Sequence, residues 1–109
     1  MSHLADENCA ALSGSEYKLP QSAIDLLMPQ LSKWTVDDQS RLSRRFAFDN
    51  FVDALSFTNA LADIAEAQGH HPDLELGWGY VVVNLSTHDV GGLSRNDFIV
   101  AARIDQLAS

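Results

Sequence analysis

The chain has 109 residues, which is the length of one ordinary domain and leaves no room for two independent cores. Hydrophobic residues make up 46% of it and charged residues 20%, so a packed globular domain is expected rather than a disordered or fibrous chain. The formal net charge of −8 argues against direct binding to nucleic-acid phosphates or to an anionic membrane.

The sequence predicts a cytoplasmic protein. Cys9 is the only cysteine, so neither an internal disulfide nor a cysteine-based metal site is expected, which fits a reducing compartment. Residues 1–20 lack the apolar segment of a secretory signal. No run of apolar residues approaches the roughly 18 that would span a bilayer.

The N-terminal part predicts a loosely ordered lead-in over residues 1–20, followed by a single domain over residues 21–109. The lead-in is polar and contains residues that interrupt regular structure, namely Ser13, Gly14, Ser15 and Pro20. A short helix is expected next, because apolar residues recur at helical spacing at Ile24, Leu27, Met28 and Leu31. Ser22 with Asp25 makes a capping box at its start, and Pro29 leaves its end undefined.

The middle of the chain predicts two strands and a long helix. Trp34 opens an extended segment, and one face of the following strand carries Leu42, Arg44, Phe46 and Phe48. Asp49 is placed to cap a long helix that ends at Gly69. The apolar residues of this helix form two adjacent rows, the first with Phe51, Leu55, Thr58, Ala62 and Ala65 and the second with Phe57, Leu61 and Ile64.

The last part predicts a hairpin and a final helix. The hairpin joins residues 74–77 to residues 80–87 through a tight reversal at Trp78. Gly91 and Gly92 break the chain, and Ser94 with Asp97 gives a capping box for a helix carrying Phe98, Ala101, Ala102 and Ile104. The order helix, two strands, helix, two strands, helix predicts an α+β fold, an antiparallel sheet with helices packed on one face.

Three of the four histidines, His70, His71 and His88, lie within a stretch of 19 residues. Imidazoles near their ordinary pKa of about 6.5 both donate and accept protons at neutral pH, which suits an acid/base reaction. The helix end at Gly69 and the nearby Glu66 favour a protonated His70. Two other interpretations stay open: the histidines merely end a helix and a strand, or they bind zinc with help from Glu66 or Asp97.

The spacing of these residues resembles the signature of the pterin-4a-carbinolamine dehydratases. The pattern is Glu66, three residues, His70-His71-Pro72, five residues, Trp78, nine residues, His88, eight residues and Asp97. Further similar elements are Ser86-Thr87-His88, Gly92-Leu93-Ser94, the run from Ala101 to Asp105, and upstream Trp34 and Phe46-Ala47-Phe48 with Phe51. The resemblance covers about residues 24–107, and it departs from the family at Gly77 and Gly79, which flank Trp78, and at residues 1–19.

The resemblance implies a four-stranded antiparallel sheet backed by helices and assembly into homodimers or homotetramers. It also implies dehydration of 4a-hydroxytetrahydropterin to quinonoid dihydropterin, a step in tetrahydrobiopterin recycling linked to an aromatic amino acid hydroxylase. This hydro-lyase reaction needs no cofactor: no metal, nucleotide or covalent intermediate. The alternative is a non-catalytic partner protein on the same fold, either a dimerisation coactivator of a transcription factor or a protein linked to molybdopterin enzymes.

The family's catalytic set falls on the three histidines. His70 and His88 match the acid/base pair, and His71 matches the histidine that holds the substrate. Glu66 would tune His70 and belongs with Pro72 to the substrate-binding set, where Pro72 fixes the backbone after the histidine pair.

Four more positions complete the substrate-binding set that the resemblance implies. Ser86 and Thr87 would present backbone groups and hydroxyls to the pterin edge. Asp97 matches the family's acid, and its alternative is a capping carboxylate of the last helix. Trp34 matches an aromatic residue near the family's pocket, and its alternative is plain core packing.

Overall fold

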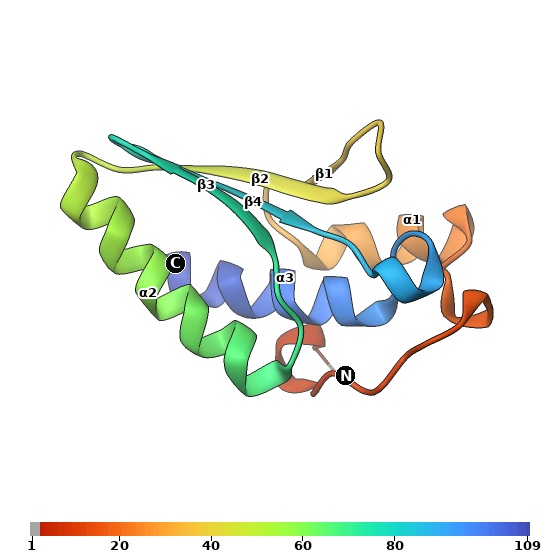
Figure 1. Ribbon diagram of the computed structural model, residues 1–109. Helices are drawn as coiled ribbons and strands as arrows, with labels where there is room; N and C mark the ends of the chain where they lie inside the picture. The colour runs from red at the N-terminus through yellow and green to blue at the C-terminus, as the bar shows by residue number, and fades with distance from the viewer. Residues whose placement is uncertain (1–2) are drawn as a thin grey trace.

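The structure is a computed structural model that describes residues 3–109. It places a sheet on one side of the molecule and the three α-helices together on the other (Figure 1). The strands are β1 Thr35–Val36, β2 Leu42–Ala47, β3 Asp73–Gly77 and β4 Tyr80–Leu85. The helices are α1 Gln21–Leu27, α2 Phe51–Gln68 and α3 Arg95–Ala108, with short 3-10 helices η1 Leu4–Asp6, η2 Ser15–Tyr17, η3 Met28–Gln30 and η4 His88–Val90.

The sheet is antiparallel throughout and has the strand order β1-β2-β4-β3. β4 therefore pairs on both sides, and alternate residues of it, Val81, Val83 and Leu85, are fully buried against the helices. The α+β prediction with helices on one face is confirmed. Within residues 3–109 no helix is both long and apolar enough to cross a membrane.

The first of the two rows predicted on the long helix is only partly buried, with Ala65 inside and Phe51 and Leu55 exposed. The residues of α2 that the fold buries are Ala54, Phe57, Leu61 and Ala65, a single stripe at helical spacing. Phe51 and Leu55, which belong to the first predicted row, are 44% and 39% exposed. These two residues lie on a different side of the helix from the stripe, so the contacts within this chain do not cover them.

The two ends of α2 are defined by capping residues, and His70 directly follows the C-terminal one. Asn50, not Asp49, caps the helix, because the Asn50 side chain accepts a hydrogen bond of 2.8 Å from the backbone N–H of Asp53. Gly69 ends the helix as predicted, in the left-handed conformation with φ 63°. The predicted capping box of α1 is also absent: Pro20 stands at its N-cap, and Asp25 accepts from the Gln21 side chain instead.

α3 is the central helix of the fold and lies under the sheet (Figure 1). Its predicted capping box between Ser94 and Asp97 is confirmed. Near its other end Asp105 accepts hydrogen bonds from the Trp34 indole at 2.7 Å and from the Arg44 guanidinium at 2.6 Å. These contacts tie β2 and the segment before β1 to α3.

The lead-in expected at residues 1–20 begins outside the described residues, at Met1 and Ser2. From residue 3 onward the segment runs past α3 towards η4 (Figure 1). Leu4 is 1% exposed, and the backbone N–H of Leu19 donates to the Leu93 carbonyl at 2.8 Å. Loose order of this segment in solution stays a prediction, but its contacts with the domain are specific.

Candidate active site

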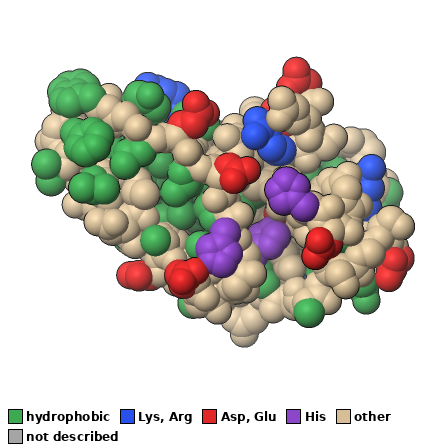
Figure 2. Space-filling view, in the orientation of Figure 1, with side chains coloured by type: hydrophobic (Ala, Val, Ile, Leu, Met, Phe, Trp, Pro, Cys, Tyr) green, Lys and Arg blue, Asp and Glu red, His purple; other side chains and the backbone are tan. Residues whose placement is uncertain are grey.

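The three clustered histidines meet at one hollow, on the face where Figure 2 shows three histidine side chains close together. The hollow measures about 260 Å³. His70 and His71 reach it from the end of α2, and His88 reaches it from η4, which follows β4. The other lining residues are Gly69, Ser86, Thr87 and Asp89. The three histidines, from the end of α2 and from the segment after β4, therefore lie together in the fold.

His70 is held by a buried carboxyl group. Its Nε2 lies 2.6 Å from Oδ1 of Asp97, and the two side chains are 13% and 0% exposed. Asp97 is therefore both the N3 residue of the α3 capping box and the partner of His70. The capping interpretation of Asp97 is confirmed, and its place in the substrate-binding set stays a prediction.

The carboxyl group of Asp97 is itself fixed by α3 and by the segment after β4. Its Oδ2 accepts hydrogen bonds from the Thr87 hydroxyl at 2.8 Å and from the Ser94 backbone N–H at 2.9 Å. The Thr87 and Ser94 hydroxyls are 2.7 Å apart, and both residues are buried. Because buried polar groups need partners, this network holds one arrangement of the Asp97 carboxyl group.

Glu66 pairs with His71 and not with His70. Oε2 of Glu66 contacts Nε2 of His71, and the side chains are 76% and 58% exposed. The expectation that Glu66 tunes His70 is therefore wrong in its contact. After Gly69 the chain leaves the helix, so the spacing of four residues between Glu66 and His70 no longer brings their side chains together.

Of the two hydroxyl residues expected to face a ligand, only Ser86 keeps free groups. The Thr87 hydroxyl is used by Asp97 and Ser94, and the Thr87 backbone N–H donates to the Gly92 carbonyl at 2.8 Å. Ser86 is half-buried and lines the hollow. Within residues 3–109 its backbone and its hydroxyl group make no hydrogen bonds of the kind that Thr87 makes, so both are available to a ligand.

His88 is exposed and stands between two hollows. On its second side lies a space of about 260 Å³ lined by Gln39, Ser40 and Arg41 of the β1–β2 loop and by Asp73. Arg41 forms an ion pair with Asp37 at 2.8 Å, and the Arg41 hydrogen bonds lower the pKa of the Asp37 carboxyl group against the opposing effect of burial. Within residues 3–109 the His88 side chain makes no hydrogen bond, and it borders both hollows.

Four residues of the predicted set do not line the histidine hollow. Glu66 and Asp97 each contact one of its histidines from outside it, and the other two are Trp34 and Pro72. Trp34 is 5% exposed, packs edge-on against Phe46 with ring centroids 6.2 Å apart, and donates to Asp105. Its core-packing alternative is therefore the observed one. Pro72 follows His71 directly and leads the chain into β3.

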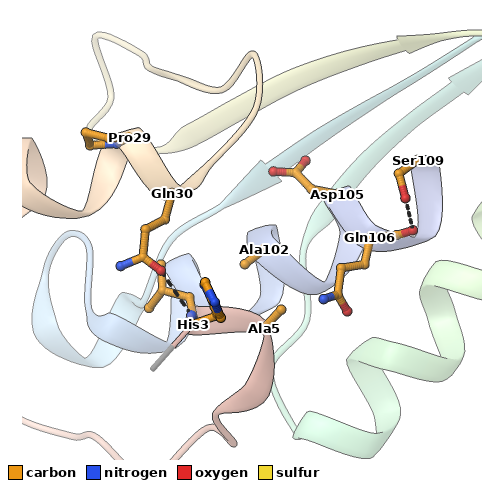
Figure 3. A pocket seen from close by; sticks show the side chains of 9 residues that line it. His3, Ala5, Pro29, Gln30, Ala102, Asp105, Gln106 and Ser109 are labelled. Atoms are coloured by element: carbon orange, nitrogen blue, oxygen red, sulfur yellow. Dashed lines mark hydrogen bonds between the residues drawn. The ribbon is translucent and has the colours of Figure 1, made fainter. Parts of the chain in front are cut away.

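A larger hollow of about 560 Å³ lies on another part of the molecule, between η1, η3 and the C-terminal half of α3 (Figure 3). Its titratable residues are His3 and Asp105, and Asp105 is already occupied by Trp34 and Arg44. It contains none of the candidate site residues predicted from the sequence. Among residues 3–109 there is no group of three or more His, Cys, Asp or Glu side chains arranged to hold a metal ion.

A further stretch lies beside His70 that was not predicted from the sequence. Residues 10–13 line a hollow of about 220 Å³ together with Gly69, His70, Thr87, Asp89 and Asn96. This stretch has no periodicity and no titratable side chain, so no local pattern marks it. Only the folded chain brings it to the site.

The fold and site define a small α+β protein with a histidine-lined hollow where α2, β4 and α3 meet. The chain belongs to the pterin 4 alpha carbinolamine dehydratase family, whose model matches residues 17–107.

Relatives and solved structures agree with this family. A Halorhodospira halophila protein named "Putative pterin-4-alpha-carbinolamine dehydratase" is 41% identical over 107 residues, covering 97% of this chain and 98% of its own. A Legionella pneumophila protein of the same name is 44% identical over 108 residues, covering 97% and 96%.

Two solved structures share the fold. The transcriptional coactivator/pterin dehydratase from Brucella melitensis has a TM-score of 0.79 and 29% identity, over 84% of this chain and 99% of its own. A pterin dehydratase-like protein identified as a RuBisCO assembly factor in the alpha-carboxysome has a TM-score of 0.61 and 32% identity, over 72% and 92%.

Proposed function

We propose that this protein dehydrates 4a-hydroxytetrahydropterin to quinonoid dihydropterin, with His70 and His88 as the acid/base pair. The observation that carries the proposal is the single hollow lined by His70, His71 and His88, one of them fixed by a buried carboxyl group. Membership of the dehydratase family supports the substrate class.

The chemistry needs two proton transfers. A carbinolamine carries a hydroxyl on the carbon that is bonded to a ring N–H. Loss of water breaks the C–O bond, takes the proton from that nitrogen and leaves a C=N double bond. One imidazolium gives a proton to the departing hydroxyl, one neutral imidazole takes the ring proton, and the pair exchanges its protonation states each turnover.

The contact with Asp97 indicates which nitrogen of His70 does this work. The Asp97 carboxylate is an acceptor for the Thr87 hydroxyl and the Ser94 N–H, so it also takes the Nε2–H of His70. Nδ1 of His70 has no hydrogen-bond partner within residues 3–109 and is left for the substrate. Asp97 is thus a positioning residue that sets the tautomer of His70.

The residues on the exposed side of the site bind the substrate in this proposal. We assign His71 to contact with the pterin and Glu66 to orienting His71, since the two side chains touch. Ser86 offers the free backbone and hydroxyl groups for the donor and acceptor edge of the pterin, and Pro72 restricts the backbone after His71. The substrate itself would come from an aromatic amino acid hydroxylase that forms the 4a-hydroxyl.

We also propose that the chain works as a homodimer or homotetramer. Exposed apolar side chains gather on the N-terminal part of α2 and on the β3–β4 hairpin, at one end of the molecule (Figure 2). They are Phe51, Val52, Leu55, Leu74 and Trp78. Contiguous apolar surface of this kind favours self-association, and light scattering on the purified protein would give a mass of two or four chains.

The test is the rate of loss of 4a-hydroxytetrahydropterin, followed by ultraviolet absorbance with and without protein. The wild type is expected to accelerate the reaction. His70→Ala and His88→Ala should each lower kcat by about 100-fold or more, the usual contribution of an acid/base group. His3→Ala is the matched control, because His3 lies in the other hollow and should leave the rate unchanged.

The second candidate is a binding partner without activity. The words coactivator and assembly factor in the names of the two similar structures support the partner role. The same assay separates the two candidates. A folded wild-type protein that leaves the rate unchanged would rule out the dehydratase and favour the partner role.

A further inference from the structure

We propose that residues 10–13, the N-terminal wall, form part of the substrate site and set its affinity for the pterin, with Asn96 as the residue that positions them. This inference rests on the proposed dehydratase function and extends it to a stretch outside the family model, which begins at residue 17. The match to the relative from Halorhodospira halophila covers 97% of this chain and so extends beyond the family model.

The size of the hollows supports the inference. Small-molecule pockets usually measure at least about 300 Å³. The histidine hollow, at about 260 Å³, and the hollow bordered by the N-terminal wall, at about 220 Å³, each fall below that size. The two adjoin, because both are lined by Gly69, His70, Thr87 and Asp89. Together they give His70 a space on both sides that a flat two-ring ligand can occupy.

The wall is held by α3 next to the residue that fixes His70. Asn96 is 5% exposed and makes two hydrogen bonds with the backbone of Ala10: it accepts from the N–H at 3.1 Å and donates to the carbonyl at 2.7 Å. Asp97, the next residue, holds His70. One turn of α3 therefore positions both the histidine and the wall that faces it.

Further contacts hold the segment on either side of the wall. The Cys9 backbone N–H donates to Gln68 at 2.7 Å, and the Gly14 N–H donates to the Asp89 carbonyl at 3.3 Å. The Glu7 carboxylate accepts two hydrogen bonds from Arg95, at 2.7 and 2.6 Å. A segment anchored at both ends is a preformed wall, so a ligand that it contacts does not have to order it.

The wall itself offers suitable groups. Leu12 is half-buried and provides an apolar side chain, and Ser13 is exposed and provides a hydroxyl. Ala10 and Ala11 are small and exposed, which keeps the hollow open. A large side chain at Ala11 would fill the space next to His70 without disturbing the core.

The test compares three tryptophan variants. Ala11→Trp fills the hollow, while Ser15→Trp puts the same side chain on an exposed residue of the same segment that does not line it. Gln39→Trp fills the hollow on the far side of His88. Dehydration kinetics give KM and kcat, and the fluorescence of 7,8-dihydropterin gives a Kd that does not depend on turnover.

Ala11→Trp is expected to raise both KM and the Kd for dihydropterin about 10-fold or more while kcat changes less than about 3-fold. Ser15→Trp should change neither constant. Unchanged KM and Kd in Ala11→Trp would overturn the inference, as would an effect confined to Gln39→Trp, because the pterin would then extend towards the β1–β2 loop. A wild type that binds dihydropterin without dehydration would overturn the proposed function alone, and a wild type that does neither would overturn both.

The reaction rate of the Cys9 thiol distinguishes a local change in the N-terminal wall from general unfolding. Burial raises the pKa of the Cys9 thiol to about 11, and its Sγ lies 3.7 Å from the Asn96 carbonyl, so it should react slowly with a thiol reagent. Asn96→Ala is expected to speed this reaction and raise KM together, with the far-ultraviolet circular dichroism unchanged. Faster Cys9 reaction with an unchanged KM would mean that the wall does not contact the substrate.

Discussion

The two adjacent histidines His70 and His71 each contact a carboxyl group, yet their surroundings are opposite. The His70 and Asp97 side chains are 13% and 0% exposed, whereas the His71 and Glu66 side chains are 58% and 76% exposed. The difference comes from where each carboxyl group lies in the fold. Asp97 lies in the first turn of the central helix α3, and Glu66 lies on an outer face of α2. The His70–Asp97 pair is thus part of the packed interior, whereas solvent screens the charges of the His71–Glu66 pair.

The largest effect is expected from Asp97→Ala. The change removes the Asp97 half of the α3 capping box and leaves the Thr87 hydroxyl, the Ser94 N–H and His70 without their shared acceptor. A lost cap costs about 1 kcal/mol and each buried unsatisfied group about 1–3 kcal/mol, so the free energy of unfolding should fall by roughly 3 kcal/mol or more. Urea denaturation measures this. A loss below about 1 kcal/mol would mean that the buried pair contributes no more than a surface pair.

A smaller loss is expected from Thr87→Val, which keeps the shape of the side chain and removes its hydroxyl. Asp97 and Ser94 each lose one hydrogen-bond partner, and the free energy of unfolding should fall by about 1–2 kcal/mol. Thr58→Val is the matched control, because the Thr58 hydroxyl bonds only the Ala54 carbonyl one turn back in α2. Equal losses in the two variants would contradict a special role for the buried network.

The helices that carry the two histidines and Asp97 were predictable from the sequence, because periodic and capping patterns mark where such elements begin and end. Gly69 after a long apolar helix and Ser94 three residues before Asp97 are local features, and both have the structure they predict. Asp49 was wrong as the cap of α2, because Asp49 and Asn50 are adjacent and equally suited to capping. Only the backbone conformation at Asn50, φ −162°, decides between them.

The partners of the two histidines were not predictable in the same way. Helical spacing favours Glu66 with His70, but the left-handed turn at Gly69 ends that spacing and aims His70 at α3, 27 residues later in the chain. The choice between the two interpretations of Trp34 was open for a similar reason, since its hydrogen bond to Asp105 spans 71 residues. Contacts at such separations depend on how the elements pack, and no local pattern carries that information.

A third carboxylate, Glu7, lies between the two extremes and predicts a dependence on pH. Its hydrogen bonds with Arg95 lower the pKa of the Glu7 carboxyl group below its ordinary value of 4.5. A lowered folded-state pKa means that this ion pair stabilises the fold above the ordinary pKa and that the contribution is lost as the pH falls through the folded-state pKa. Anchoring of residues 7–10 should therefore weaken in acid, at a pH below 4.5.

Hydrogen exchange of the Cys9 and Ala10 amides, followed from about pH 6 down to pH 3, measures this weakening after correction for the intrinsic rates. Glu7→Gln has no carboxyl group to titrate and should show weaker protection at every pH without the acid transition. Identical pH profiles in the wild type and Glu7→Gln would mean that the Asn96 and Gln68 contacts hold the segment without Glu7.

The smallest effect is expected from Glu66→Ala. Exposed ion pairs contribute between zero and about 1 kcal/mol, because water screens the charges and both side chains lose freedom when they pair. Removing Glu66 should change the free energy of unfolding by less than about 0.5 kcal/mol, well below the loss from Asp97→Ala. Any effect should appear in KM, because His71 would lose its orienting partner while His70 keeps Asp97. A fall in kcat comparable to that of His70→Ala would instead mean that the exposed pair takes part in proton transfer, and the division between the two histidines would have to be reversed.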